Sequence, residues 1–76
     1  MANIFHPNEP TLHIRFQGRS WDVACRELDI GQLSSDDQVR RAVAGFFDVS
    51  PAQFRAYVVE RHANGNMTVR PEAVFG

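Results

Sequence analysis

The stretch TLHIRFQGRSWDVACRE, residues 11–27, decides the fold of this 76-residue chain. Apolar residues occupy every second position on both sides of Gly18, which is the pattern of two strands that each bury one face. A two-residue turn at Gly18-Arg19 would make every apolar residue meet another apolar residue. The expected facing pairs are Phe16 with Trp21, Ile14 with Val23, Leu12 with Cys25 and, on the other side, Arg15 with Asp22. The sequence therefore predicts an antiparallel hairpin of residues 12–17 and 20–27 with one buried side.

Length and charge limit the classes of protein that this chain can belong to. A chain of 76 residues makes one domain and buries only about 60% of its unfolded surface. Its net charge of −1 argues against bulk attraction to nucleic acid or to a membrane. The sequence contains neither a signal peptide nor an apolar run long enough to span a bilayer. We therefore expect a cytoplasmic monomer that binds neither nucleic acid nor membrane.

The first ten residues differ from the rest. Residues 1–10 contain Pro7 and Pro10 and show little hydrophobic periodicity, so we expect a flexible leader there and a single folded domain over residues 11–76. Cys25 is the only cysteine, so the chain cannot form an internal disulfide. It falls on the apolar face of the second strand, which predicts a buried, unreactive thiol.

A helix is expected after a short link in which Leu28, Ile30 and Leu33 should turn toward the core. Ser35-Asp36-Asp37-Gln38 has the form of a capping box, with two acidic residues where the helix dipole favours them. Apolar residues then recur at helical spacing and give one buried stripe. The expected stripe is Val39, Val43, Phe46 and Phe47, with Arg40, Arg41 and Ala44 lying away from it.

The second half of the chain predicts one helical turn and a second hairpin. Ser50 caps the turn, Pro51 suits its first position, and Phe54 should close the core. Residues 57–61 and 67–70 then read as strands around Asn64-Gly65. A two-residue turn would set Val59 against Arg70. The preferred three-residue loop, with Gly65 in the left-handed conformation, sets Val59 against Val69 and Tyr57 against Pro71.

The order strand, strand, helix, strand, strand predicts a two-layer α+β domain in which a four-stranded sheet covers one helix. The chain resembles the ubiquitin-like β-grasp superfamily in this order of elements and in its length. It also resembles that superfamily in the Ser-x-x-Gln that opens the helix and in Val49-Ser50-Pro51-Ala52-Gln53 before the third strand. The resemblance spans residues 11 to about 71. It implies a mixed sheet of order 2-1-4-3, with the first and last strands parallel at the centre.

No pattern of residues predicts catalysis or metal binding. His6, His13 and His62 are expected far apart, in the leader, on the sheet and beside a turn. Cys25 is expected inside, so no histidine can activate it, and no paired ligand spacing suggests zinc. Asp36 and Asp37 are explained by helix capping. We therefore expect no enzyme activity, no cofactor and no metal.

The sheet face away from the helix is the first candidate site. His13, Arg15, Thr68 and Arg70 should lie there, on the two adjacent central strands. A face that tilts toward positive charge can dock the acidic patch of a protein partner or a phosphate, although a merely solvated face would show the same residues. No aromatic side chain is expected on it, which disfavours nucleic acid.

The second candidate site is Gly76. Ubiquitin-like modifiers and sulfur carriers are activated at a C-terminal glycine, so the resemblance implies an adenylating enzyme as partner if Gly76 has that role. The chain departs from the family pattern because Val74-Phe75 stand where a second glycine is usual. All eight basic residues are arginine, which would prevent conjugation of a modifier to itself, but a GC-rich genome produces the same bias.

The sequence thus favours a non-enzymatic, ubiquitin-like protein–protein interaction module that uses its exposed sheet face. The alternative is a ubiquitin-like modifier or sulfur carrier activated at Gly76.

Overall fold

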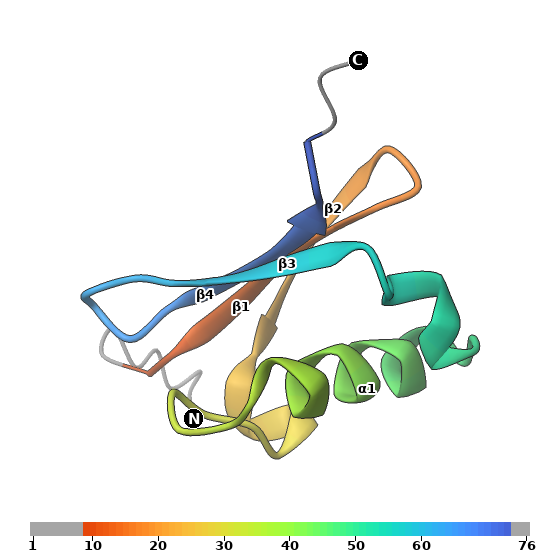
Figure 1. Ribbon diagram of the computed structural model, residues 1–76. Coiled ribbons are helices and arrows are strands. Elements are labelled where there is room, and N and C mark those ends of the chain that lie inside the picture. Colours follow the sequence, from red (N-terminus) through yellow and green to blue (C-terminus); the bar gives the residue numbers. More distant parts are fainter. Residues whose placement is uncertain (1–8, 74–76) are drawn as a thin grey trace, which may run out of the picture.

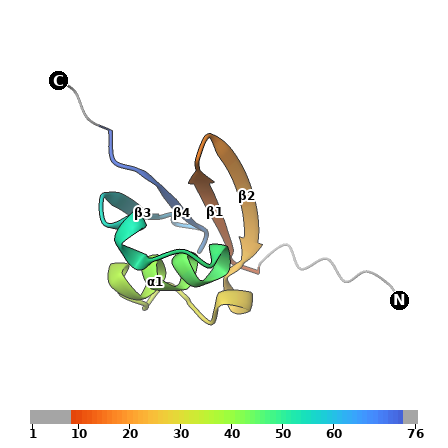
Figure 2. The same cartoon turned by 90° about the vertical axis from the view of Figure 1, so that its right-hand side faces the viewer.

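The computed structural model describes residues 9–73 and shows a sheet with a helix packed on one face (Figures 1 and 2). The elements in chain order are β1 (Thr11–Phe16), β2 (Arg19–Ala24), the 3-10 helix η1 (Cys25–Leu28), α1 (Asp36–Phe47), the 3-10 helix η2 (Pro51–Phe54), β3 (Tyr57–Arg61) and β4 (Met67–Pro71). The sheet is mixed, with order β2-β1-β4-β3 and with β1 parallel to β4 at its centre. The predicted α+β fold class and strand order are confirmed, and the arrangement is consistent with a β-grasp-like fold.

The first hairpin turns one residue earlier than expected. Gln17 and Gly18 form the turn, with φ of 54° and 77°. Two successive left-handed residues give a type I′ turn, whose twist matches that of the strands and which favours glycine at its second position. The observed pairs are Phe16 with Arg19, Ile14 with Trp21, Leu12 with Val23 and His13 with Asp22. The predicted register was wrong by two residues, an error that keeps the side chains of the paired residues on their expected faces and that apolar alternation therefore cannot detect.

The second strand is shorter than predicted because the chain leaves the sheet at Cys25. The backbone N–H of Cys25 donates to the carbonyl of Pro10 at 3.0 Å, and η1 begins there. The thiol is buried as predicted, and burial raises the pKa of Cys25 above its ordinary value. Leu28 and Ile30 pack against the core. Leu33 is fully exposed, so the prediction that it turns inward was wrong.

The capping box of α1 is confirmed. The backbone N–H of Gln38 donates to Ser35 Oγ at 3.1 Å, and the backbone N–H of Ser35 donates to Gln38 Oε1 at 2.7 Å. The buried stripe is rotated from the predicted one, because Ala44 is 1% exposed and Phe46 is 44% exposed. Because the side chain of Ala44 is small, α1 can turn its Ala44 side toward the sheet. This roll about the helix axis places Phe46 at the surface.

The second half of the chain follows the prediction. Ser50 Oγ accepts a hydrogen bond from the backbone N–H of Ala52 at 3.2 Å and caps η2, whose Phe54 is fully buried. In the β3–β4 hairpin, Val59 pairs with Val69 and Tyr57 pairs with Pro71. Gly65 has a φ of 95°, as a three-residue loop requires.

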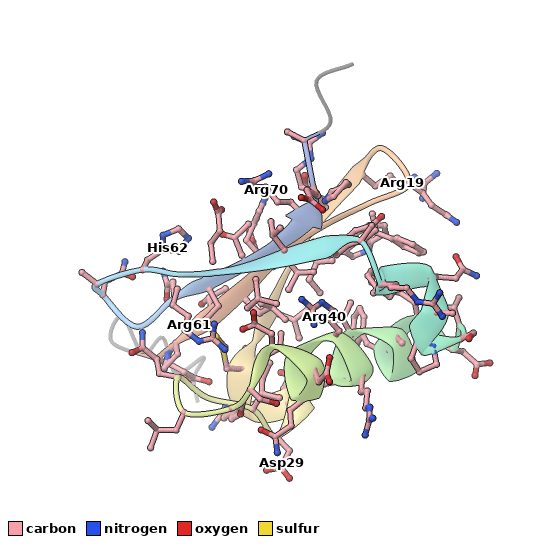
Figure 3. All side chains as sticks on the ribbon, viewed as in Figure 1. Arg19, Asp29, Arg40, Arg61, His62 and Arg70 are labelled. Atoms are coloured by element: carbon pink, nitrogen blue, oxygen red, sulfur yellow. The ribbon has the colours of Figure 1, made fainter. Side chains whose placement is uncertain are left out.

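Two arginines connect the helix layer to β3 (Figure 3). Arg61 Nη1 lies 2.6 Å from Asp36 Oδ1, and its Nη2 donates to the carbonyl of Ser34 at 2.7 Å. Arg40 Nε donates to the carbonyl of Tyr57 at 3.0 Å. Each guanidinium satisfies a backbone carbonyl as well as a carboxylate, so it fixes the start of α1 against this edge strand. The core between the layers is formed by Leu12, Ile14, Phe16, Val23, Cys25, Val39, Val43, Ala44, Phe54, Met67 and Val69.

Two phenylalanines of different burial provide a test of this core. Phe54→Ala should destabilise the domain by about 3–5 kcal/mol because it removes a fully buried ring. Phe46→Ala should change the free energy of unfolding by no more than about 1 kcal/mol, because Phe46 lies at the surface. Urea denaturation measures both, and equal losses would contradict the observed roll of α1.

The same substitution at two glycines should have opposite effects. Gly18→Ala should cost about 1–2 kcal/mol because position 18 has a positive φ, although a Cβ there meets no neighbouring atom. Gly45→Ala should stabilise by about 0.5–1 kcal/mol because alanine favours the helix and the added Cβ again has room. Thermal unfolding shows whether each substitution raises or lowers the stability of the domain. An unchanged stability of Gly18→Ala would argue against the type I′ turn.

Candidate functional site

The structure brings the four predicted site residues together on the face of the sheet away from α1, which we term the outer face. His13 of β1 pairs directly with Thr68 of β4, and Ile14 pairs with Val69. Arg15 and Arg70 are therefore the next residues on the two parallel strands and lie on the same side as His13 and Thr68. Figure 3 shows Arg70 pointing away from α1. In the described part of the chain no element covers this face.

Arg70 is held in place by an acidic residue of the edge strand. Its Nη2 donates to Glu60 Oε2 at 3.0 Å, and its Nη1 donates to the carbonyl of Pro71 at 3.2 Å. The hydrogen bond from Arg70 lowers the pKa of Glu60 below its ordinary value, and attraction to Arg70 and His62 adds to that effect. The same carboxylate raises the pKa of Arg70. The pair orients the guanidinium, although exposed pairs of this kind stabilise little.

His13 and Thr68 each have a side-chain partner. His13 Nδ1 lies 2.6 Å from Asp22 Oδ1 on β2. Thr68 Oγ1 lies 2.9 Å from His62 Nε2, just beyond the end of β3. Both contacts run across the sheet and align the polar groups of neighbouring strands.

Arg15 differs from the other three site residues. The predicted register would set it opposite Asp22, but in the observed register it lies opposite Ser20, and Asp22 lies opposite His13. Arg15 is exposed, and within residues 9–73 no carboxylate forms an ion pair with it. The observed register therefore leaves one guanidinium, on a central strand near the hairpin turn, available to a partner.

The outer face is more evenly charged than expected. A second strand extending to residue 27 would place Arg26 on this face beside Asp22, but Arg26 lies in η1, where its Nε is 2.7 Å from Glu9 Oε2. The remaining charges are Arg15 and Arg70 against Asp22 and Glu60. The positive character of the face is therefore local to Arg15.

Sequence reasoning did not assign His62 to this site. Its position two residues after Glu60 gives it the same side of the sheet, so strand alternation was the signal that could have found it. With His62 included, each of the four strands contributes a side chain that is hydrogen-bonded to one on a neighbouring strand or just beyond its end: Asp22 with His13, Thr68 with His62, and Arg70 with Glu60.

A second group of arginines lies on the helix side of the molecule. Arg40, Arg41 and Arg55 line a hollow of about 260 Å³ together with Asp37, Pro51 and Ala52. Arg40 Nη1 is paired with Asp37 Oδ1 at 3.0 Å. Arg41 and Arg55 are exposed and provide matched controls for the arginines of the outer face.

The described residues contain neither a group of potential metal ligands nor a membrane-spanning helix. Within them no three His, Cys, Asp or Glu side chains gather as a metal site would require. None of the helices in residues 9–73 has the length and apolar character needed to cross a membrane. Gly76, the predicted site of activation, lies outside the described residues, as does most of the leader expected at residues 1–10.

Comparison of the chain with protein-family models, with curated proteins and with solved structures finds no match.

The Arg70–Glu60 pair gives a prediction in solution. Arg70→Ser should raise the pKa of Glu60 toward its ordinary value because it removes the hydrogen bond and the attraction that lower it. A carboxyl pKa lowered by folding stabilises the folded state above the pKa of the unfolded chain, and this contribution is lost as the pH falls through the lowered value. Carboxyl NMR titration of the wild type and of Arg70→Ser measures the change, with Arg55→Ser as control. An unchanged Glu60 would show that the pair does not form.

Proposed function

We propose that this chain is a small, non-enzymatic, ubiquitin-like interaction module that binds an acidic segment of a protein partner through its outer face. The observation that supports this proposal most directly is Arg15, an exposed guanidinium on a central strand with no ion-pair partner within residues 9–73. Arginine is the basic side chain best suited to forked pairing with a carboxylate. A partner carboxylate would replace water at Arg15 without breaking a contact inside the domain.

The neighbours of Arg15 give the proposed interface its direction. Arg70 lies beside Arg15 on the neighbouring parallel strand β4, and its Nη2 donates to Glu60 Oε2 at 3.0 Å. Its guanidinium is therefore positioned before a partner arrives. Thr68 and His13 extend the polar surface along β1 and β4. Asp22 and Glu60 flank this central pair of strands and would repel an acidic segment laid across the edge strands. The charges therefore favour an acidic segment aligned with β1 and β4.

Affinity capture with matched double variants tests the proposal. The immobilised wild type should retain a partner from a lysate of its own cells, and Arg15→Ser with Arg70→Ser should lower the affinity about tenfold or more. Both substitutions lie on the surface, so the free energy of unfolding should change by no more than about 1 kcal/mol. The purified partner should shift backbone amide signals of β1 and β4 in NMR spectra.

The double variant Arg41→Ser with Arg55→Ser is the control, since it removes the same charge from the other side of the molecule. Equal loss of binding in both double variants would mean that only the total charge matters and would refute the outer face as the site. Amide shifts produced in β1 and β4 by inorganic phosphate, with no protein captured, would identify the ligand as a phosphate.

The alternative function, a modifier or sulfur carrier activated at Gly76, stays a prediction from the sequence. Deletion of Gly76 separates the two functions, because binding through the outer face does not use that residue. Capture that is unchanged by the deletion supports the interaction module, and an acyl adenylate or thiocarboxylate that depends on Gly76 supports the carrier.

A further inference from the structure

The end of the molecule at the β1–β2 turn carries a hollow of about 540 Å³ on the helix side of the sheet, which we term the aromatic groove. It is lined by Phe16, Gln17, Arg19, Trp21, Phe47 and Val49. The ring of Phe47 lies 4.8 Å from those of both Phe16 and Trp21, so three aromatic rings form one continuous surface. Trp21, Phe47 and Val49 are only partly buried, which leaves this surface open to solvent.

The register of the first hairpin creates the groove. Phe16 pairs with Arg19 and not with Trp21, so the first inward position of β2, opposite Phe16, holds a charged side chain where the predicted register would place tryptophan. Asp48 ends α1 one residue after Phe47, so the helix stops before it covers this end of the sheet. The apolar floor therefore remains uncovered.

Arg19 supplies a positive charge at this apolar surface. The other described residues that line the groove are uncharged. Within residues 9–73 no carboxylate forms an ion pair with Arg19. Figure 3 shows its side chain at the end of the hairpin, extending beyond the strands. A ligand that filled the groove with an apolar group and placed a carboxylate at Arg19 would match both features.

The exposure of the aromatic surface favours a protein segment over a small molecule. Small ligands are held in cavities that enclose most of their surface, whereas this groove is open. Phe46 is 44% exposed, and its ring lies edge-on at 4.9 Å from Phe47, so the apolar surface continues past the groove onto α1. Tryptophan, other aromatic residues and arginine are typical of the side chains that dominate binding between proteins.

We propose that the aromatic groove binds a peptide segment of a partner protein in which an aromatic or large aliphatic residue stands next to an aspartate or glutamate. The apolar side chain packs against Trp21 and Phe47, and the neighbouring carboxylate pairs with Arg19. Trp21 and Phe16 point to the opposite side of the sheet from Arg15 and Arg70, so this site does not depend on the function proposed for the outer face.

Peptide selection tests the groove, with a direct signal from the protein. Random peptides displayed on phage are selected on the folded chain, and the enriched sequences are synthesised without tryptophan. They should carry an aromatic or large aliphatic residue beside an acidic one. Trp21 is the single tryptophan of the chain, so peptide binding should change its fluorescence. Arg19→Gln should weaken binding about fivefold, the effect of losing an exposed charge pair.

Arg55→Gln is the matched control, because it removes an exposed arginine outside the groove and should leave peptide affinity unchanged. Phe46→Ser should weaken peptides that extend onto α1. The proposal is overturned if no peptide is enriched, if the enriched peptides lack the acidic–apolar pair, or if they bind Arg19→Gln as tightly as the wild type. A fluorescence change that follows protein concentration without peptide, with a dimer in sedimentation, would instead identify a second copy of the chain as the occupant.

Discussion

The turn at Gln17 and Gly18 is the constraint on which both surfaces of this domain depend. Two successive residues with positive φ close the first hairpin, and the turn alone selects among registers that bury the same side chains. On the outer face this register gives Asp22 to His13 and leaves Arg15 without a carboxylate. On the helix side it sets Arg19 beside Phe16 and opens the aromatic groove. One local backbone conformation thus decides which arginines are available.

The rest of the fold holds that hairpin against a small core. β1 and β4 occupy the centre of the sheet, and their inward residues Leu12, Ile14 and Val69 are fully buried. Arg40 and Arg61 fix α1 to β3 through backbone carbonyls. The distant edge of the sheet is thereby tied to the helix, whereas the end of β2 beside the turn receives only the end of α1. The sheet is therefore tied to α1 along its β3 edge and left open at the β2 edge beside the turn.

The sequence predicted those features that depend on local chemistry. The capping box at Ser35 and the Pro51 turn follow from neighbouring residues, so the elements that they begin were predicted. At the Gly65 loop two turns were possible, and the preferred three-residue loop gives the observed register. The first register was not predicted, because a shift of two residues keeps the paired side chains on the same faces. The roll of α1 toward Ala44 was likewise hidden, because apolar spacing does not weigh the small volume that allows close packing. Site residues were placed on the correct face, but their partners depended on the register.

In the described part of the chain, the arginines of the domain divide into those that form ion pairs with its own carboxylates and those that do not. All eight arginines lie within the described residues, and those paired with carboxylates there are Arg26, Arg40, Arg61 and Arg70. Arg26, Arg40 and Arg61 join one element to another or brace α1, and Arg70 is positioned by its pair. Ion pairs at a surface add little stability, so orientation is their main effect. Arg15 and Arg19 are exposed and have no such pair within residues 9–73, so a partner carboxylate would meet no competing one there. The same hairpin holds these two on opposite sides of the sheet, so the two proposed binding surfaces do not share an arginine.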